Sequence, residues 1–183
     1  MLTKYKKFLE ELDRELRGYF SEHQEYLKCK KGCTDCCESG EYPFSRLEAE
    51  YLMYGFVNLP KEIKSEIRKN IAELKISKNK FKGERFLYKC PFLVNNACTL
   101  YERRGIVCRT FGLAYLKEDN TIKLPNCTNL GLNYAEIYNP KTGEIFLENP
   151  IKKELSIDKI LRNKDAENLE LECGEIRPLI DWF

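Results

Sequence analysis

Four cysteines stand close together in the first quarter of this 183-residue chain. They follow the spacing Cys29-x3-Cys33-x2-Cys36-Cys37, and Gly32 between the first two lets the backbone turn tightly. The surrounding residues are mostly Lys, Asp and Glu, whereas cysteines that serve only packing have no reason to gather in a polar segment. Thiolates are ligands of zinc and of iron–sulfur clusters, so we interpret residues 29–37 as part of a metal site.

A second group of cysteines stands further along the chain, after residue 89. The motif at 29–37 would satisfy one ion poorly, because two of its four thiols are adjacent. Ligands from the second group would relieve this strain and would cross-link distant parts of the chain, which removes entropy from the unfolded state. We therefore predict that both groups ligate the same or neighbouring metals. The predicted metal ligands are Cys29, Cys33, Cys36, Cys37, Cys90, Cys98, Cys108 and Cys127.

The residue types define the kind of ligand better than they define the metal. Eight thiolates would satisfy two all-sulfur tetrahedral zinc ions, whereas one iron–sulfur cluster, such as 4Fe-4S, needs four. Adjacent Cys36 and Cys37 favour the iron–sulfur cluster slightly over zinc. Neighbouring side chains are expected to point in different directions, and so to serve two metals or a polynuclear centre more naturally than one tetrahedral ion. Cys173 has no motif around it and is expected to be a structural thiol.

Two other uses of the motif agree less well with the sequence. The x3 and x2 spacing also holds the cluster of radical-SAM enzymes, but no run of βα units follows it here to build their partial barrel. Thiol–disulfide exchange is expected of a lone Cys-x-x-Cys on a thioredoxin-like βαβ pattern, which the chain lacks. The sequence also lacks a phosphate-binding glycine loop, a nucleophile elbow and a dinucleotide fingerprint, so no catalytic residue is predicted.

The N-terminal elements that must position these cysteines are predicted to be helical. Apolar residues recur at intervals of three and four between Tyr5 and Leu27, which predicts an amphipathic helix leading into the motif. Ser45 and Glu48 form a capping-box pattern before an apolar run. Pro60 suits the first turn of a further helix. The predicted buried face of that helix is Ile63, Ile67, Ile71 and Leu74.

The middle of the chain is predicted to be more irregular. Residues 76–85 are polar and basic, which indicates a loop. Thr99 and Glu102 form a second capping-box pattern, and Gly105 is placed to end a short helix at 100–104. Residues 106–116 are predicted to be extended.

The last third combines turn, strand and helix signals. Hairpin turns are predicted at 117–120 and 139–144, with strands at 121–127 and 132–139 and a helix within 156–171. The predicted fold class is α+β, a small helix-dominated domain with a minor antiparallel sheet, organised around the cysteine-ligated metal centre. We expect a single domain over 1–183, formed by an N-terminal amphipathic helix at 1–28, a metal-binding core at 29–127 and a hairpin with a helical extension at 128–183.

The charge balance indicates which partners to expect. Lys and Arg number 31 against 29 Asp and Glu, and 43% of the residues are hydrophobic. The basic residues between Lys61 and Lys82 alternate with an amphipathic pattern that lacks aromatic stacking residues, so no nucleic acid is expected as a partner. No signal peptide or apolar membrane span is evident, which predicts a cytoplasmic protein with reduced thiols and no membrane partner. A protein partner stays open.

Several blocks in order resemble one family. The motif at 29–37, the segment Cys90-Pro-Phe-Leu and the block Cys98-Thr-Leu-Tyr-Glu-Arg-Arg-Gly-Ile-Val-Cys108-Arg-Thr-Phe are similar to the YkgJ-type cysteine-cluster family, over roughly residues 29–127. The resemblance implies a zinc- or iron-chelating domain. One departure is Arg104-Gly105, where the family usually has Arg-Pro, although glycine still permits the sharp turn.

The resemblance also implies an enzymatic alternative. The family is distantly similar to flagellin lysine N-methylases, which are thought to use an iron–sulfur centre, so a cluster-dependent protein-modifying enzyme stands beside a metal-binding protein without catalysis. Arg109 and Tyr101 belong to the matching block. Arg109 would either offset the negative charge of the thiolates or be an ordinary surface arginine. If Tyr101 has no role at the metal site, it is expected to be a core residue. His23, on the apolar face of the first helix, is predicted to be a packed core histidine.

Overall fold

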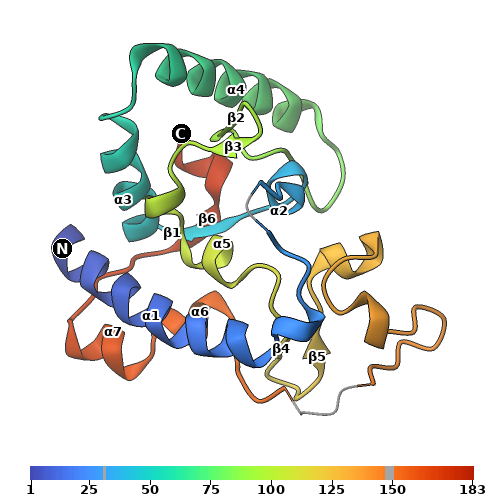
Figure 1. The fold of residues 1–183 in the computed structure, drawn as a ribbon. Helices are drawn as coiled ribbons and strands as arrows, with labels where there is room; N and C mark the ends of the chain where they lie inside the picture. Colours follow the sequence, from blue (N-terminus) through green and yellow to red (C-terminus); the bar gives the residue numbers. More distant parts are fainter. Residues whose placement is uncertain (31, 147–150) are drawn as a thin grey trace. The chain divides into compact units, whose positions relative to one another are not determined.

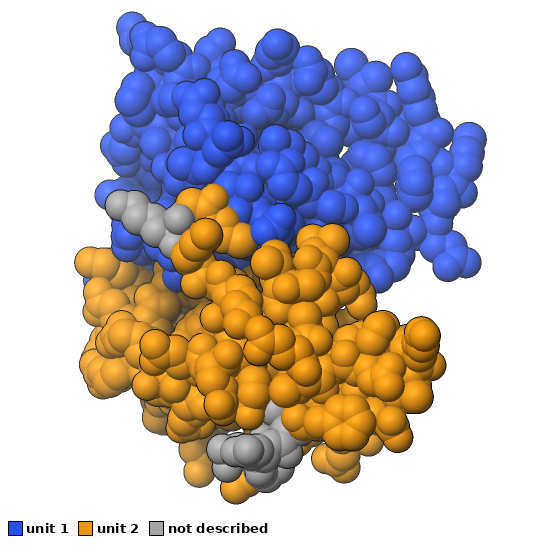
Figure 2. Space-filling view, turned by 45° about the vertical axis from the view of Figure 1, so that its right-hand side comes forward, with its two compact units in different colours: residues 1–3, 34–108, 172–183 blue, residues 4–33, 109–171 orange. Residues whose placement is uncertain are grey.

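The computed structural model describes residues 1–30, 32–146 and 151–183 (Figure 1). The chain divides into two compact units, coloured separately in Figure 2. Unit 1 comprises residues 1–3, 34–108 and 172–183, and unit 2 comprises residues 4–33 and 109–171. The boundary between Cys33 and Thr34 lies inside the cysteine motif, so Cys29 and Cys33 belong to unit 2 whereas Cys36 and Cys37 belong to unit 1. The division into segments 1–28, 29–127 and 128–183 stays a prediction.

The α+β fold class is confirmed. About half of the residues are helical, and the strands that the structure describes form three short antiparallel pairs. Strand β1 (Pro43–Ser45) pairs with β6 (Ile176–Pro178), and the two lie side by side in Figure 1 although they are far apart in the sequence. The other pairs are hairpins: β2 (Leu93–Val94) with β3 (Ala97–Cys98), and β4 (Tyr115–Leu116) with β5 (Ile122–Lys123).

Unit 2 contains the predicted N-terminal helix, which is confirmed as α1 (Leu2–Glu22) followed by the 3₁₀ helix η1 (Gln24–Tyr26). One face of α1 is buried at the predicted spacing of three and four residues. The buried side chains of this face are Tyr5, Phe8, Leu9, Leu12, Leu16 and Tyr19.

The rest of unit 2 is built from turns and short helices. The turn at 117–120 joins β4 to β5, and the turn at 139–144 is closed by an antiparallel bridge between Tyr138 and Ile145, so both predicted turns are confirmed. The helical pattern at 156–171 forms two helices, α6 (Ile157–Leu161) and α7 (Lys164–Asn168). The 3₁₀ helices η3 (Asn126–Leu130) and η4 (Ala135–Ile137) complete the described elements of this unit.

Unit 1 packs two helices around an aromatic and aliphatic core. Helices α3 (Arg46–Phe56) and α4 (Lys61–Lys80) contribute to this core, and the predicted buried face of α4 is confirmed, with Ile67 completely buried. The core residues of this cluster are Tyr42, Phe44, Leu52, Phe56, Ile67, Tyr88, Phe92, Leu100, Leu179 and Ile180. The smaller elements are α2 (Asp35–Glu38), η2 (Tyr101–Arg103), α5 (Ile106–Thr110), whose last two residues belong to unit 2, and η5 (Leu179–Trp182).

The capping box at Ser45 and Glu48 is confirmed, and it has a second role. Glu48 is 1% exposed, and one carboxylate oxygen accepts a hydrogen bond from the Ser45 backbone N–H at 2.8 Å. The other carboxylate oxygen accepts from the Ile106 backbone N–H at 2.7 Å. A side chain at Gly105 would meet the Phe44 ring at 2.7 Å and this carboxylate at 2.8 Å, so glycine is required. Glu48 therefore fixes the start of α5, the helix that carries Cys108.

Four local predictions in the middle and last third were wrong. Residues 76–80 continue α4 and are not part of a loop, because Lys78 and Lys80 in the last turn favour the negative end of the helix. The Thr99 hydroxyl donates to the Phe92 carbonyl at 3.0 Å and does not cap a helix. Residues 106–110 are helical and not extended, since the Glu48 carboxylate binds the N–H at the start of α5. The strand expected at 132–139 contains η4 instead.

We expect Glu48→Ala to lower the free energy of unfolding by about 2–4 kcal/mol, because two buried backbone N–H groups lose their acceptor. Glu50→Ala, two residues later on the exposed side of α3, removes only a surface ion pair with Arg46 and should change this free energy by less than about 0.5 kcal/mol. Urea unfolding followed by circular dichroism would measure both. Equal small losses in the two variants would show that Glu48 does not anchor α5.

Candidate metal centre

Five of the predicted ligands belong to unit 1, and we call them the five-thiol group. Helix α2 carries two of them, one precedes β2, one ends β3 and one lies on α5. All five side chains are partly buried, and they are Cys36, Cys37, Cys90, Cys98 and Cys108. The sulfur atoms of Cys36 and Cys37 lie 3.7 Å apart and share a hydrogen bond, so these adjacent side chains point to the same side.

Backbone hydrogen bonds hold three of these segments together. The Cys90 N–H donates to the Cys37 carbonyl at 2.8 Å. Next to this contact, Gly40 and Tyr88 exchange two backbone hydrogen bonds of 3.0 and 2.9 Å. The β2–β3 hairpin then places Cys98 directly opposite Leu93, whose N–H donates to the Cys90 carbonyl. The segments that carry Cys36, Cys37, Cys90 and Cys98 are therefore positioned by the main chain and do not depend on side-chain packing alone.

Burial and mutual repulsion disfavour thiolates in this group. Burial raises the pKa of Cys90 to about 12, with smaller contributions from the charges of Cys98 and Cys36. The hydrogen bond with Cys37, followed by burial, raises the pKa of Cys36. Burial also raises the pKa of Cys108 well above its ordinary value, and the charges of Cys90, Cys98 and Cys36 add to this rise. The environments of Cys36, Cys90, Cys98 and Cys108 consequently favour the neutral thiol unless a cation is supplied among them.

Arg104 acts on a cysteine of this group, whereas the sequence offered Arg109 for that role and left it open. Burial raises the pKa of Cys98, and the Arg104 guanidinium opposes this rise. Arg104 also lies over the Tyr101 ring, 3.8 Å from its centre. Tyr101 is 59% exposed, so its interpretation as a core residue was wrong. The local block held no signal to separate Arg104 from its two arginine neighbours.

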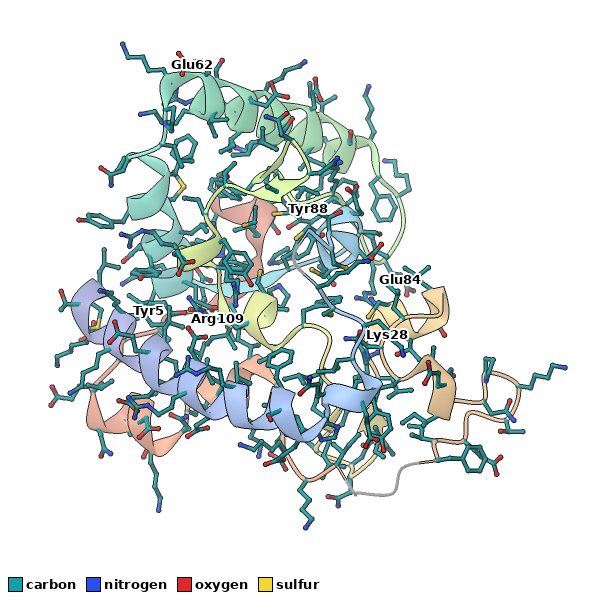
Figure 3. All side chains as sticks on the ribbon, viewed as in Figure 1. Tyr5, Lys28, Glu62, Glu84, Tyr88 and Arg109 are labelled. Carbon is teal, nitrogen blue, oxygen red and sulfur yellow. The ribbon has the colours of Figure 1, made fainter. Side chains whose placement is uncertain are left out.

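Arg109 is buried and forms an ion pair with Asp13 of α1, both within unit 2. Figure 3 labels Arg109 on α5. It is therefore not an ordinary surface arginine. Its ion pair with Asp13 links the chain directly after Cys108 to α1.

The other three predicted ligands belong to unit 2, and we call Cys29, Cys33 and Cys127 the three-thiol group. Cys29 and Cys33 are exposed and Cys127 is buried. The Cys33 N–H closes a turn onto the Lys30 carbonyl at 3.0 Å, and Gly32 has a φ of 91°, which confirms the tight turn expected there. Burial raises the pKa of Cys127 to about 11, and the charges of Cys29 and Cys33 also raise it.

Asn133 organises this group and was not anticipated from the sequence. Its completely buried amide donates to the Cys29 sulfur at 3.1 Å and to the Gly112 carbonyl at 2.8 Å, and accepts from the Lys28 N–H at 2.8 Å. Its backbone carbonyl accepts from the Thr128 hydroxyl at 2.7 Å, next to Cys127. Gly112 has a φ of 92°, and a side chain there would meet the Asn133 amide at 2.8 Å. Asn133 thus connects the segments that carry Cys29 and Cys127.

His23 is confirmed as a packed core histidine. It is 4% exposed, and its ring lies 4.4 Å from the Tyr19 ring in an edge-on arrangement. Burial lowers its pKa. Cys173 lies in unit 1, where its backbone carbonyl accepts from the Leu47 N–H at 3.1 Å. That Cys173 takes no part in metal binding stays a prediction.

Among the described residues, the thiols of neither group form a complete ligand set as they stand. Within residues 1–30, 32–146 and 151–183, no three Cys, His, Asp or Glu side chains meet in a geometry that could hold a metal ion. Cysteine side chains turn about a single bond, χ1, between staggered positions. Metal binding would therefore require rotation of thiol side chains on a backbone that is already in place.

The comparisons with known proteins identify one family. The model of the CxxCxxCC family, described as a "Putative zinc- or iron-chelating domain", matches residues 28–130, more than half of the chain. No curated protein and no solved structure matches the chain. Across the part of the chain that the structure describes, none of the helices has the length and apolar character needed to cross a membrane. The chain belongs to the CxxCxxCC family, whose members are described as zinc- or iron-chelating domains.

Proposed function

We propose that the protein binds metal through both thiol groups, one in each unit. The observation that carries this proposal is the five-thiol group. The main chain brings thiols together from separate segments into a partly buried setting where burial and like charges oppose their ionisation. Arg104 lowers the pKa of Cys98, opposing the effect of burial. A bound metal ion would supply the positive charge that lets several of these thiols ionise together.

Zinc is the metal that we propose for the five-thiol group. With a zinc–sulfur bond of about 2.3 Å, two thiolates on one tetrahedral ion lie roughly 3.8 Å apart. The Cys36 and Cys37 sulfurs, 3.7 Å apart, fit that spacing. In a 4Fe-4S cluster each iron takes a single thiolate, so the ligand sulfurs diverge, whereas each iron of a 2Fe-2S cluster takes two thiolates. The expectation that adjacent cysteines serve different metals favoured a cluster, whereas the observed separation supports one ion shared by both.

The proposed ligands of this ion are Cys36 and Cys37 with thiols from the second cysteine region. Since a tetrahedral ion takes four ligands, it would use two of Cys90, Cys98 and Cys108. The fifth thiol would stay protonated. Zinc supplies no redox chemistry, so it would act here as a cross-link between α2 and the hairpin.

The three-thiol group is proposed as a second metal site. Cys29 and Cys33 come from the motif and Cys127 from the second region, so this group also joins the two regions. Asn133 orients the Cys29 sulfur through a hydrogen bond of 3.1 Å. At this proposed site the three sulfur ligands would be those of Cys29, Cys33 and Cys127.

We expect protein purified without oxygen to contain at least one tightly bound metal equivalent, measured by elemental analysis, because a bound cation stabilises clustered cysteines as thiolates. Chelator treatment should lower the melting temperature, since metal bound only by the folded state stabilises it. Metal below about 0.2 equivalents, with all thiols freely titratable, would contradict the proposal.

We expect Cys36→Ser combined with Cys37→Ser to abolish metal loading of the five-thiol group and to lower stability in the loaded protein. Cys173→Ser is the matched control in the same unit and should leave metal content and stability nearly unchanged. Elemental analysis and thermal unfolding would be compared for the two variants. If both lose metal equally, the ligand set has been assigned wrongly.

A further inference from the structure

One surface of unit 1 combines exposed apolar side chains with arginines. Helix α3 and the 3₁₀ helix η2 contact one another and lie side by side (Figure 1). At the C-terminal end of α3, Tyr54 is 53% exposed and Val57 is 58% exposed, and Tyr101 of η2 is 59% exposed. Exposed apolar groups that gather on one surface mark sites of interaction. We call this the tyrosine–arginine surface, and its residues are Tyr54, Val57, Tyr101, Arg103 and Arg104.

The Arg103 side chain is held in place by α3. Its guanidinium carbon lies 4.9 Å from the centre of the Tyr51 ring and 4.8 Å from the centre of the Tyr54 ring. Its stem crosses α3 at Gly55, where an added Cβ atom would clash with the Arg103 Cδ. The side chain is therefore already ordered in the single chain, so a contact made through it costs little rotamer entropy.

Arg103 also has hydrogen-bond donors to spare. Within the described residues, no carboxylate forms an ion pair with Arg103, and its side chain donates no hydrogen bond. The residue is partly exposed, and its unpaired N–H groups reach solvent. Another arginine of α3, Arg46, pairs with Glu50 at 3.3 Å. A guanidinium presents its N–H groups as a planar fork that matches the two oxygens of a carboxylate.

Further cations border the exposed apolar side chains. Arg104 lies over the Tyr101 ring. The Lys64 ammonium of α4 donates a hydrogen bond to the Val57 carbonyl at 3.0 Å. An apolar centre with a polar rim is the usual anatomy of a protein interface, where tyrosine and arginine often contribute most of the binding energy. By charge complementarity, the surface fits a segment that carries carboxylates beside apolar side chains.

We propose that the tyrosine–arginine surface binds an acidic segment of a partner protein, with a carboxylate of the segment on the Arg103 guanidinium. Apolar side chains of the segment would cover Tyr54, Val57 and Tyr101. The inference goes beyond the proposed metal binding and does not rest on it.

A single-stranded nucleic acid fits this surface less well than an acidic peptide. Its bases would need open aromatic faces to stack on. Here a guanidinium already lies over each of the rings of Tyr51, Tyr54 and Tyr101. Glu102 is exposed between the arginines and Tyr101, and its carboxylate would repel a phosphate backbone.

Selection from a library of random peptides, with the full chain prepared without oxygen as the target, tests the proposal. The selected peptides should be rich in Asp and Glu next to apolar residues. The affinity of a selected peptide would then be measured by fluorescence anisotropy. Arg103→Gln should weaken binding about tenfold, as the loss of a central charged contact does. Arg103→Lys should also weaken it, because an ammonium cannot reproduce the planar fork.

Two further variants control for folding and for charge. Tyr54→Ala changes an exposed side chain, so it should keep the urea midpoint of unfolding nearly unchanged and still weaken peptide binding about threefold or more. Arg177→Gln is the matched control in unit 1, because Arg177 lies 5.4 Å from the centre of the Trp182 ring but pairs with Glu175 at 2.6 Å. It belongs to β6, outside the surface, and should keep the affinity within about twofold.

The outcomes separate this inference from the proposed function. Selected peptides without acidic enrichment would overturn the inference, and so would equal peptide affinity in the unaltered chain, Arg103→Gln and Tyr54→Ala. A pool of single-stranded RNA that binds more tightly than the peptide, and binds Arg103→Gln more weakly than the unaltered chain, would replace the protein partner by a nucleic acid. Peptide binding through Arg103 in a chain that holds no metal would support the inference while the proposed function fails.

Discussion

The rest of the structure depends on the electrostatic repulsion among thiols that the fold has partly buried. In a medium of low dielectric constant, neighbouring thiolates repel strongly, and burial disfavours each charged form by itself. Burial is the largest cause of the raised pKa of Cys90, Cys98 and Cys108, and charges of neighbouring cysteines add to it. The pKa of Cys36 is raised first by its hydrogen bond with Cys37 and then by burial. Several buried thiolates close together repel one another, and a bound cation would offset that repulsion. We regard this balance as the reason why the thiols are gathered.

In each unit, one buried polar side chain positions a segment that carries a cysteine. The Glu48 carboxylate in unit 1 is 1% exposed and accepts a hydrogen bond from a backbone N–H of a distant segment. The Asn133 amide in unit 2 is completely buried and donates to a backbone carbonyl of a distant segment. Each of these residues fixes an element that carries a cysteine, and each is packed against a glycine, Gly105 or Gly112, whose missing side chain leaves the space. Buried polar groups that are fully hydrogen-bonded specify one arrangement of the chain.

The sequence predicted those features whose signals are local. The helical period found α1, the Ser45–Glu48 pattern found the capping box, and turn residues found both hairpin turns, because each signal lies within a few residues. The helix at 106–110 was missed because its first N–H is bound by Glu48, 58 residues away. Asn133 was missed because its partners Lys28, Cys29 and Gly112 are remote in sequence. The division of the motif between two units likewise has no local signal.

X-ray absorption at the metal edge of the loaded protein tests the central claim most directly, because it identifies the metal and counts its ligand atoms without disturbing the thiols. The account predicts a zinc edge, with sulfur as the dominant neighbour at about 2.3 Å and no metal–metal distance in the first shells. An iron edge with a short iron–iron distance would contradict zinc while keeping thiolate ligation. A metal surrounded only by oxygen and nitrogen would contradict the cysteine-ligated centre itself.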